Sequence, residues 1–598
     1  MNEMVADTEA EIAENPMALN PEHPDWPLVS LAEANAILTA EGSTFETETV
    51  EINGRPTTVW KNIPPSFADF ARAARMAFAA REFVVFEDER VTYDAWFRAV
   101  SALARKFQEM GVQKGDRIAL ATRNLPEWPV VYFATLSIGA IAVPLNGWWT
   151  GGELEYGLAD SGAKILVADG ERYDRIAPHL ANLPGIEKII VTRPGGELGE
   201  DVTLLSDLIG TSADWANLPD EDIPAADIGP ETDASILYTS GTTGKPKGAI
   251  ATHRNSLTNL LSSGYAVARG ALRRGDPVAP PGTIPDPMCL LLVIPLFHVT
   301  GCTAMMGPLI AGGSKMVLMH KWDTVRAMEL IEREKVTLTG GVPTIAWQIL
   351  EHPDRDKYDL SSLDSITYGG APASPDLVRK IKGDFKASPA MGWGMTETSG
   401  TVTGHSAEDY LNRPDSCGPP VPVAKLKIMS EDGSRELPTG EIGELWAFGA
   451  QVVRGYWNKP EANAETFVDG WIRTGDLAKL DEEGFCYICD RAKDMIIRGG
   501  ENIYSSEVEN VLYDHPSVTD AALVGLPHKQ LGEEPAAVVH CTKGQEVSEA
   551  ELQAWVAERL ARFKVPVKIA FVEETLPRNA NGKIMKKDLP RLYFGVEG

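Results

Sequence analysis

A glycine- and hydroxyl-rich loop constrains the fold of this chain more than any other stretch. Residues 238–248 have the sequence Tyr-Thr-Ser-Gly-Thr-Thr-Gly-Lys-Pro-Lys-Gly, and the apolar residues 234–237 before them predict a buried strand. A strand that leads into such a loop directs backbone N–H groups and hydroxyls into a small concavity that binds phosphate. The Gly-Lys-Ser/Thr ending of a Walker A loop is missing. The loop therefore predicts a phosphate site of another type, with an ordinary flexible turn as the alternative.

The length and the charge of the chain limit its architecture and its partners. A chain of 598 residues is too long for one compact core, so we expect two or more domains. The formal net charge of −29 argues against a nucleic-acid partner, because a basic footprint is missing. Six cysteines in this length do not form a disulfide scaffold, and the isolated pair Cys486 and Cys489 is expected to be structural.

The distribution of apolar residues predicts a cytoplasmic protein without a transmembrane segment. The acidic N-terminus lacks the apolar stretch of a signal peptide. The longest apolar run, Met288–Phe297, has about ten residues, which is too short to span a bilayer. Residues 1–60 are acidic with scattered prolines, and we interpret them as an N-terminal extension without chemistry of its own.

Helical and strand patterns alternate along most of the chain. Apolar periodicity predicts helices over residues 93–110, 172–183 and 253–268, and short apolar runs predict strands at 117–121, 164–167 and 290–294. Such alternation indicates an α/β architecture with largely parallel sheets and helices on their faces. Beyond residue 507 the pattern changes to that of a small α+β domain.

Four further segments follow the loop along the sequence. They are PLFHVTG at 295–301, MGWGMTET at 391–398, WIRTGDL at 471–477 and LPRNANGKIMKK at 576–587. Together with the loop, they resemble the motifs of the adenylate-forming superfamily. This superfamily comprises acyl-CoA synthetases, aryl-CoA ligases, peptide-synthetase adenylation domains and firefly luciferases. The resemblance extends from about Ser66 to about Leu592.

The resemblance implies both a fold and a reaction. The expected fold is a large α/β domain over residues 61–490 and a small mobile α+β domain over 491–598, joined by a hinge. The expected enzyme is an acyl-CoA synthetase that uses ATP, Mg²⁺ and coenzyme A. It converts a carboxylic acid to an acyl-adenylate with release of pyrophosphate, and it then transfers the acyl group to the CoA thiol.

The resemblance also assigns the nucleotide site. Trp393 is expected to flank the base, Thr396 to hydrogen-bond the phosphate, and Asp476 to accept hydrogen bonds from both ribose hydroxyls. Glu397 and Thr242 are the expected ligands of Mg²⁺, a hard cation that prefers oxygen. The full expected set for ATP and AMP is Thr239, Ser240, Gly241, Thr242, Thr243, Gly244, Lys245, Lys247, Gly370, Ala371, Pro372, Gly392, Trp393, Gly394, Met395, Thr396, Asp476 and Arg491.

Catalytic groups and the domain switch are assigned by the same resemblance. The expected catalytic residues are Lys583, Glu397 and His298. Lys493 is the expected hinge. The residues expected to line the CoA channel after the small domain rotates are Gly499 and Gly500. The role of Arg498 stays open.

Two further lysines follow Lys583, and the acyl pocket has its own expected residues. Lys586 and Lys587 are interpreted as solvated helix charges. The expected pocket comprises Phe297, Thr300, Gly301, Cys302, Gly341 and Gly394.

The position of Gly394 bears on which acid is used. Acetyl-CoA synthetases, which the segment 391–398 also resembles, have a bulky Trp there, so Gly394 implies room for a longer or wider acid. Residues 340–344 are small and mostly apolar and form an expected pocket wall. We therefore expect a medium- or long-chain fatty acid, with an aromatic acid as the alternative.

Other functions remain open at this point. A separate carrier protein could replace CoA as the acceptor, although the chain contains no carrier domain of its own. A luciferase-type oxygenase and a non-catalytic nucleotide-binding protein are the remaining alternatives. The expected partners are small molecules only (the acid, ATP and CoA), with no nucleic acid, and the protein is expected to be a monomer or a homodimer.

Overall fold

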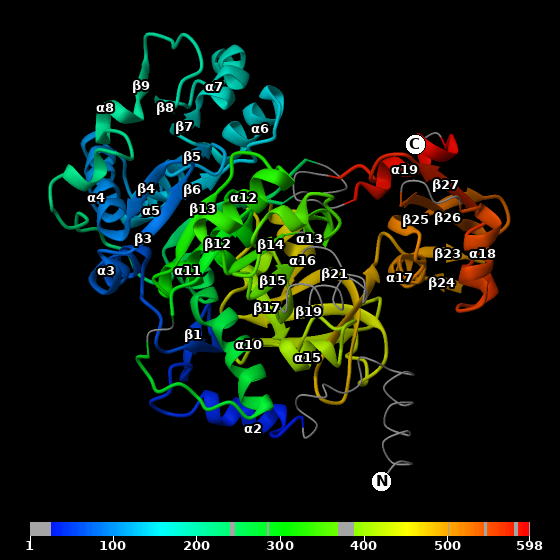
Figure 1. The fold of residues 1–598 in the computed structure, drawn as a ribbon. Helices are drawn as coiled ribbons and strands as arrows, with labels where there is room; N and C mark the ends of the chain where they lie inside the picture. The colour runs from blue at the N-terminus through cyan, green and yellow to red at the C-terminus, as the bar shows by residue number, and fades with distance from the viewer. Residues whose placement is uncertain are drawn as a thin grey trace.

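The computed structural model describes residues 26–239, 245–283, 286–341, 343–368, 388–499, 501–542, 547–578 and 584–596. Within these ranges the larger N-terminal part contains two mainly parallel sheets, an antiparallel sheet and a two-stranded hairpin (Figure 1). The smaller C-terminal part, coloured orange to red in Figure 1, is built on one further sheet. This arrangement confirms the predicted fold class of a large α/β part and a small α+β part.

The first large sheet has seven strands in the order β11-β10-β6-β5-β7-β8-β9. All neighbours are parallel except β10 and β11. Helices cover both faces, which explains why its central strands are apolar along their whole length. The strands are β5 (Arg117–Ala121), β6 (Ile141–Pro144), β7 (Ile165–Asp169), β8 (Lys188–Thr192), β9 (Val202–Leu204), β10 (Asp233–Tyr238) and β11 (Gly248–Thr252).

The second large sheet has eight strands in the order β17-β16-β15-β14-β12-β13-β3-β4, parallel except for the pair at each end. One core cluster joins it to the first sheet through the helices between them. The strands are β3 (Glu82–Phe86), β4 (Glu89–Thr92), β12 (Cys289–Leu292), β13 (Lys315–Leu318), β14 (Leu338–Gly341), β15 (Ser365–Tyr368), β16 (Ser388–Met395) and β17 (Gly400–Ser406).

The helices divide among the layers of these two sheets. Those between the sheets are α3 (Phe67–Phe78), α4 (Tyr93–Glu109) and α5 (Glu127–Ser137). Those on the outer face of the first sheet are α6 (Gly151–Ser161) and α7 (Gly170–Ile176). Those on the outer face of the second are α12 (Thr324–Glu334) and α13 (Pro343–Leu350). None of the helices in the described ranges combines the length and the apolar character that a bilayer span needs.

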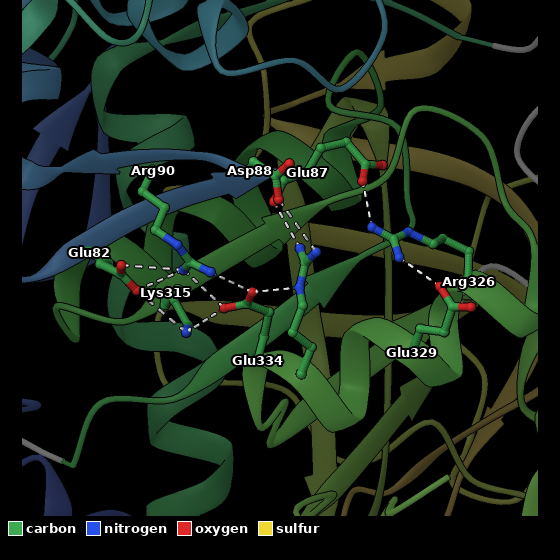
Figure 2. Close-up of polar contacts among 9 residues, drawn as sticks. Glu82, Glu87, Asp88, Arg90, Lys315, Arg326, Glu329 and Glu334 are labelled. Atoms are coloured by element: carbon green, nitrogen blue, oxygen red, sulfur yellow. Dashed lines mark hydrogen bonds and ion pairs between the residues drawn. The ribbon is translucent and has the colours of Figure 1, made fainter. Parts of the chain in front are cut away.

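An ion network braces one edge of the second sheet, as Figure 2 shows. The side chain of Glu334, at the end of α12, is 2% exposed. It accepts hydrogen bonds from Arg90 at 2.8 Å and from Lys315 and Arg333 at 3.1 and 3.0 Å. Burial alone would raise the pKa of Glu334, but these cations outweigh it and lower the pKa to about 2. The network ties the hairpin of β3 and β4 to α12.

The antiparallel sheet follows the second large sheet in sequence. Its order is β18-β19-β21-β20, with β22 beside β21. Residues 31–60 pack against this region, since Leu38 and Trp60 lie in one core cluster with Tyr265. The elements are α2 (Leu31–Leu38), β1 (Thr47–Ile52), β2 (Arg55–Trp60), β18 (Ala424–Met429), β19 (Gly443–Gly449), β20 (Phe467–Val468), β21 (Trp471–Leu480) and β22 (Cys486–Arg491).

The small part is a five-stranded sheet with two main helices. Its order is β24-β23-β26-β25, with β27 beside β26. Its buried residues form a cluster of their own. The elements are β23 (Ile496–Arg498), β24 (Glu501–Ile503), α17 (Ser505–Tyr513), β25 (Val518–His528), β26 (Gly532–Cys541), α18 (Glu549–Ala557), β27 (Lys568–Val572) and α19 (Leu589–Phe594).

A buried charge cluster joins the end of β22 to α17. Asp490 accepts hydrogen bonds from the backbone N–H of Ser505 and, at 3.0 Å, from its hydroxyl. Lys586 donates to the Ser505 hydroxyl at 2.7 Å and forms an ion pair of 2.6 Å with Glu509. The prediction that Lys586 is a solvated charge is therefore wrong, because its two buried carboxylate neighbours come from distant segments. Lys587 is exposed, as predicted.

The secondary structure differs from the sequence prediction mainly at helix ends. The helix predicted over 172–183 ends at Ile176 and continues as a 3₁₀ helix over Ala177–Asn182. Pro178 lies in its first turn and has no N–H to extend an α-helix. The helix predicted over 253–268 is split into α9 (His253–Leu257) and α10 (Asn259–Arg274).

Candidate active site

The stem of the predicted phosphate loop is an antiparallel pair of strands. Strands β10 and β11 pair from Tyr238 opposite Gly248, and the Thr239 N–H donates to the Lys247 carbonyl at 2.9 Å. Gly248 is needed here, since a Cβ would lie 2.4 Å from Ile236 Cγ2. The loop residues Ser240, Gly241, Thr242, Thr243 and Gly244 lie outside the described residues.

Two lysines leave this stem beside aromatic rings. Lys245 Nζ lies 4.8 Å from the ring centre of Tyr156, and the Tyr156 hydroxyl donates to the Pro246 carbonyl at 2.9 Å. Lys247 Nζ lies 4.8 Å from the ring centre of Tyr456. Cation–π contacts of this kind hold an ammonium group without neutralising its charge. Both cations therefore stay able to meet an anion at the loop.

The segment 396–398 forms a tight turn with a buried carboxylate. Glu397 is 6% exposed, and its Oε1 accepts a hydrogen bond of 2.7 Å from the Tyr456 hydroxyl. Burial raises the pKa of Glu397, while the Tyr456 bond and the charges of Arg491 and Lys247 act in the opposite direction. Burial also raises the pKa of Tyr456, so its phenol stays a donor.

The surroundings of Glu397 suit Mg²⁺. Among the described residues, no group of three or more His, Cys, Asp or Glu side chains is placed to hold a metal ion. Magnesium does not need such a group, because it is commonly held by one or two carboxylates together with substrate phosphates and water. Glu397 supplies one hard oxygen donor, and the nearby Lys247 ammonium can meet the phosphate charge, so the two residues fit a magnesium–phosphate complex. Thr242, the second expected ligand, lies outside the described residues.

Three side chains from three predicted motifs meet at Asp476. The Trp393 indole N–H donates to Asp476 Oδ2 at 2.9 Å, and Arg491 Nε lies 3.2 Å from Asp476 Oδ1. Asp476 and Arg491 are register partners in β21 and β22, and Asp476 is 4% exposed. The contacts fix the carboxylate in a single orientation at the edge of the segment 391–398.

His298 follows the buried strand β12 and is held in a neutral form. Burial lowers the pKa of His298 to about 4. The Thr300 N–H donates to His298 Nδ1 at 3.2 Å, so the ring proton lies on Nε2. The segment is fastened to the first sheet by Asn124, which donates to the Ile294 carbonyl and accepts from the Leu296 N–H.

The expected acyl-pocket residues are only partly consistent with a pocket. Phe297 and Cys302 are buried, and burial raises the pKa of the Cys302 thiol to about 12, so the thiol is inert. Gly341 faces apolar groups, since a Cβ would meet Ile345 Cδ1 at 2.7 Å. Gly301 instead faces backbone, because its Cβ would lie 2.3 Å from the Pro295 carbonyl oxygen.

The structure gives Gly394 a second reason to be glycine. A Cβ at this position would lie 1.8 Å from the Gly400 carbonyl oxygen, where β16 and β17 pair with a register shift. The glycine therefore permits close approach of the two strands. The inference that Gly394 leaves room for a longer or wider acid stays a prediction.

Several expected residues are not tested by these contacts. Gly370, Ala371, Pro372, Gly500 and Lys583 lie outside the described residues. The remaining ones are placed along the chain as follows: Gly392 and Met395 in β16, Thr396 in the turn after it, Lys493 between β22 and β23, and Gly499 after β23.

A cationic cluster that the sequence reading missed lies at the carboxyl end of the first sheet. Arg123, after β5, is 9% exposed, and its guanidinium carbon lies 3.3 Å from the ring centre of Trp148. No described residue forms a hydrogen bond or ion pair with this guanidinium. Burial and the charge of Arg172 lower the pKa of Arg123 to about 10. Arg172 is fully buried and pairs with Asp169 at 3.1 Å, yet its Nη2 also lacks a partner in the described part of the chain.

The position of this cluster follows from the strand order. The chain leaves β5 for β6 on one side and then crosses to β7 on the other. The carboxyl ends of β5 and β7 therefore form a topological switch point, where α/β sheets bind ligands. Arg123 follows β5 and Asp169 ends β7. The usable sequence signal was a charged residue two positions after each of two predicted buried strands.

Comparisons with known proteins agree with this geometry. Residues 70–457 match the family model described as AMP-binding enzyme, and residues 507–583 match its AMP-binding enzyme C-terminal domain. The chain is 34% identical over 532 residues to a long-chain-fatty-acid–CoA ligase of Bacillus subtilis, covering 86% of this chain and 92% of that protein. It is also 34% identical over 503 residues to a feruloyl-CoA synthase of an Amycolatopsis species, covering 84% and 94%.

Solved structures give the same result. The o-succinylbenzoate CoA synthetase of Bacillus subtilis with its acyl-adenylate intermediate has a TM-score of 0.70 and 30% identity, covering 88% of this chain and 98% of that one. The same synthetase with ATP and magnesium has a TM-score of 0.71, covering 88% and 99%. This chain belongs to the AMP-binding enzyme family, and its class is that of the AMP-forming acid–CoA ligases.

Proposed function

We propose that this enzyme joins a carboxylic acid with an apolar body to CoA, using Mg²⁺ and ATP. The observation that carries the proposal is the meeting of four distant segments: Lys247 and Glu397 share the Tyr456 side chain, and Trp393 and Arg491 share Asp476. A carboxylate has no good leaving group, so activation to an acyl-adenylate is the chemical reason for such a nucleotide site.

In the first half-reaction a carboxylate oxygen of the acid bonds to the α-phosphorus of ATP. The bond from this phosphorus to pyrophosphate breaks in line, and charge grows on the phosphoryl oxygens. Lys245, Lys247 and the loop between Thr239 and Lys245 would hold these oxygens. Mg²⁺ bound at Glu397 supplies charge neutralisation at the phosphates. Lys583 is proposed as the cation that acts in this half-reaction alone.

The residues around Asp476 would provide the specificity for the nucleotide. Its carboxylate can accept hydrogen bonds from both ribose hydroxyls, and the contact with Arg491 holds its orientation. Trp393 presents a flat indole whose N–H is already bound to Asp476, so its ring is free to lie along the base. The neutral His298 can donate its Nε2 proton to an oxygen of the acid or of the α-phosphate.

In the second half-reaction the CoA thiolate attacks the acyl carbonyl carbon. The bond from this carbon to the AMP oxygen then breaks, and AMP leaves as an anion. Lys493 is proposed as the pivot about which the small part turns, bringing Gly499 and Gly500 to the site in place of Lys583. Residues of the same chain would thereby stabilise the transition states of both half-reactions.

The cluster of Arg123, Arg172 and Trp148 is the proposed site for the nucleotide end of CoA. CoA carries phosphates, and arginine binds phosphate oxygens with two parallel N–H groups. Arg123 already stacks on an indole, and no described residue forms an ion pair with its guanidinium, so a phosphate can meet it without displacing another partner. Asn124 links this cluster to the His298 segment.

The acid is proposed to be a fatty acid or an arylalkenoic or aryl acid. The described wall residues Phe297, Cys302 and Gly341 are apolar and buried, which favours an apolar acyl body. Relatives at the same identity differ on this point, because one is named for long-chain fatty acids and another for ferulate. Both classes of acid therefore stand equally in this proposal.

Pyrophosphate release across a panel of acids tests the proposal. The panel runs from acetate through long-chain fatty acids to benzoate and cinnamate types, each with and without CoA. A CoA-dependent maximum at one chain length or ring type is the expected result. Pyrophosphate without CoA dependence would favour transfer to a carrier protein, and no release with any acid would refute the enzyme assignment.

A further inference from the structure

The backbone carbonyl of Ser399 receives hydrogen bonds from two side chains of distant elements. Asn259 Nδ2, from α10, donates to it at 2.7 Å, and Thr303 Oγ1 lies at the same distance. Asn259 and Ser399 are fully buried, and Thr303 is 3% exposed. Hydrogen bonds in such surroundings are shielded from water, so they restrain the carbonyl strongly.

This carbonyl belongs to the turn that carries Glu397. Ser399 has φ of +52° and Gly400 has φ of +120°. A left-handed conformation at a residue other than glycine is strained and persists only where neighbouring groups impose it. The two donors to Ser399, together with the Thr401 N–H bound to Asn259 Oδ1 at 2.8 Å, are such groups.

Thr303 reaches the turn from the other side of the site. It lies in a π-helical segment, Thr300–Met305, that begins two residues after His298. Widened turns of this type occur often at functional sites. Its single hydroxyl proton has two acceptors at 2.7 Å, the Ser399 carbonyl and the Val299 carbonyl one turn earlier. The hydroxyl thus connects the segment beside the acid to the turn beside the metal.

We propose that Thr303 is a positioning residue that holds the Glu397 turn in the geometry required for Mg²⁺·ATP. It acts through the Ser399 carbonyl and touches neither the nucleotide nor the metal. The proposal rests on the assignment of Glu397 to Mg²⁺ made above. When the hydroxyl is absent, the turn keeps only the Asn259 contact on this carbonyl, and the Glu397 carboxylate is then oriented by the Tyr456 hydrogen bond with less support from its own backbone.

The test compares ATP affinity with and without Mg²⁺ in the absence of any acid. Intrinsic tryptophan fluorescence of the full-length chain would follow the binding of ATP, first with EDTA and then with MgCl₂. The ratio of the two dissociation constants measures how well the metal is held. Thr303→Val keeps the shape and removes the donor, and the ratio should fall about tenfold. Thr303→Ser restores the hydroxyl, and the ratio should return to within about twofold of the wild type.

Thr135→Val is the matched control. Thr135 is fully buried, and its hydroxyl donates to the Val131 carbonyl at 2.8 Å, the same bond that Thr303 makes to Val299. It lies in α5, away from Ser399. The control variant loses the same bond to its own helix, so any difference between the two variants reports the Ser399 contact. Its ratio should stay within about twofold of the wild type.

The outcomes separate this proposal from the proposed function. Equal ratios for Thr303→Val and the wild type, or equal losses in Thr303→Val and Thr135→Val, would overturn the role of Thr303. A wild type whose ATP affinity is independent of Mg²⁺ would overturn both the magnesium assignment and this proposal. A wild type that binds Mg²⁺·ATP but releases no pyrophosphate with any acid would overturn the proposed function alone.

Discussion

Replacing Arg123 by Met should change stability and CoA affinity in opposite directions. The guanidinium of Arg123 is largely buried on Trp148, and its Nε lacks a hydrogen-bond partner within the described ranges. Its pKa is lowered to about 10, which means that burial disfavours the charged form in the folded state. At neutral pH the group is charged both in the folded and in the unfolded chain, so the folded state carries the whole penalty.

The stability gain can be bounded from this shift. One pKa unit corresponds to about 1.4 kcal/mol, and partial hydration of the outer nitrogens reduces the effect, so we expect a gain of about 1–2 kcal/mol. Methionine has a similar length and keeps the packing on Trp148. The free energy of unfolding of the ligand-free enzyme, from urea denaturation at pH 7, should therefore rise in Arg123→Met.

CoA affinity should fall in the same variant. A charge-assisted hydrogen bond to phosphate contributes about 1.5–3 kcal/mol, which corresponds to a rise of about 10- to 100-fold in the KM for CoA. Pyrophosphate release in the first half-reaction should be unchanged, because no contact with the adenylate is proposed for Arg123. Steady-state thioester formation, at saturating ATP and acid, measures the change.

Arg269→Met is the contrasting control. Arg269 is fully buried, and unlike Arg123 it donates hydrogen bonds to the carbonyls of Gly404 and Pro420. The same substitution there should lower stability, because two buried carbonyls lose their donors. A CoA KM within twofold of the wild type in Arg123→Met, or a loss of stability equal to that of Arg269→Met, would refute the reasoning about this cluster.

Three further predictions concern other charged groups. Lys586→Met should cost about 3 kcal/mol of stability by leaving Glu509 buried and unpaired, whereas Lys587→Met should change it by less than about 0.5 kcal/mol, both measured by urea denaturation. Glu334→Gln should cost about 2 kcal/mol at pH 7. Because the folded pKa of Glu334 is lowered, its contribution is complete above the ordinary carboxyl pKa and declines as the pH falls toward about 2, so the difference from wild type in thermal scans should shrink over that window. Asp476→Asn should raise the KM for ATP about tenfold in pyrophosphate assays, and an unchanged KM would contradict its proposed place at the ribose.

Local patterns were sufficient to predict most secondary structure. The helix predicted over 93–110 is observed as Tyr93–Glu109, and the strand predicted at 234–237 as Asp233–Tyr238. Both depend on apolar spacing within a few residues, which the sequence displays directly. The residues that meet at Asp476 could also be identified from the sequence, because each motif had a recognisable sequence of its own.

Contacts between unremarkable residues could not be predicted. Arg123, Trp148 and Arg172 belong to no motif, and only the strand order brings them together. Lys586 follows a basic loop and looks solvated until β22 and α17 supply Asp490 and Glu509. The contacts of such side chains depend on tertiary packing, which local propensity does not predict.

Glycine positions were the hardest to interpret from the sequence. Gly394 was interpreted as room for a longer or wider acid, and the structure adds a second role, because a Cβ there would lie 1.8 Å from the Gly400 carbonyl oxygen. A missing side chain can serve a cavity or a close approach of two strands, and the sequence does not distinguish between them.

The neighbouring residues Asp490 and Arg491 tie one strand to both parts of the molecule. Arg491 pairs with Asp476 in the large part, and Asp490 binds Ser505 in the small part. If Lys493 is the pivot, the Asp490 contact joins residues on opposite sides of it, and a large rotation must break that contact. Each turnover would then break and re-form a buried hydrogen-bonded pair. Substrate binding would therefore have to shift the population of this conformer.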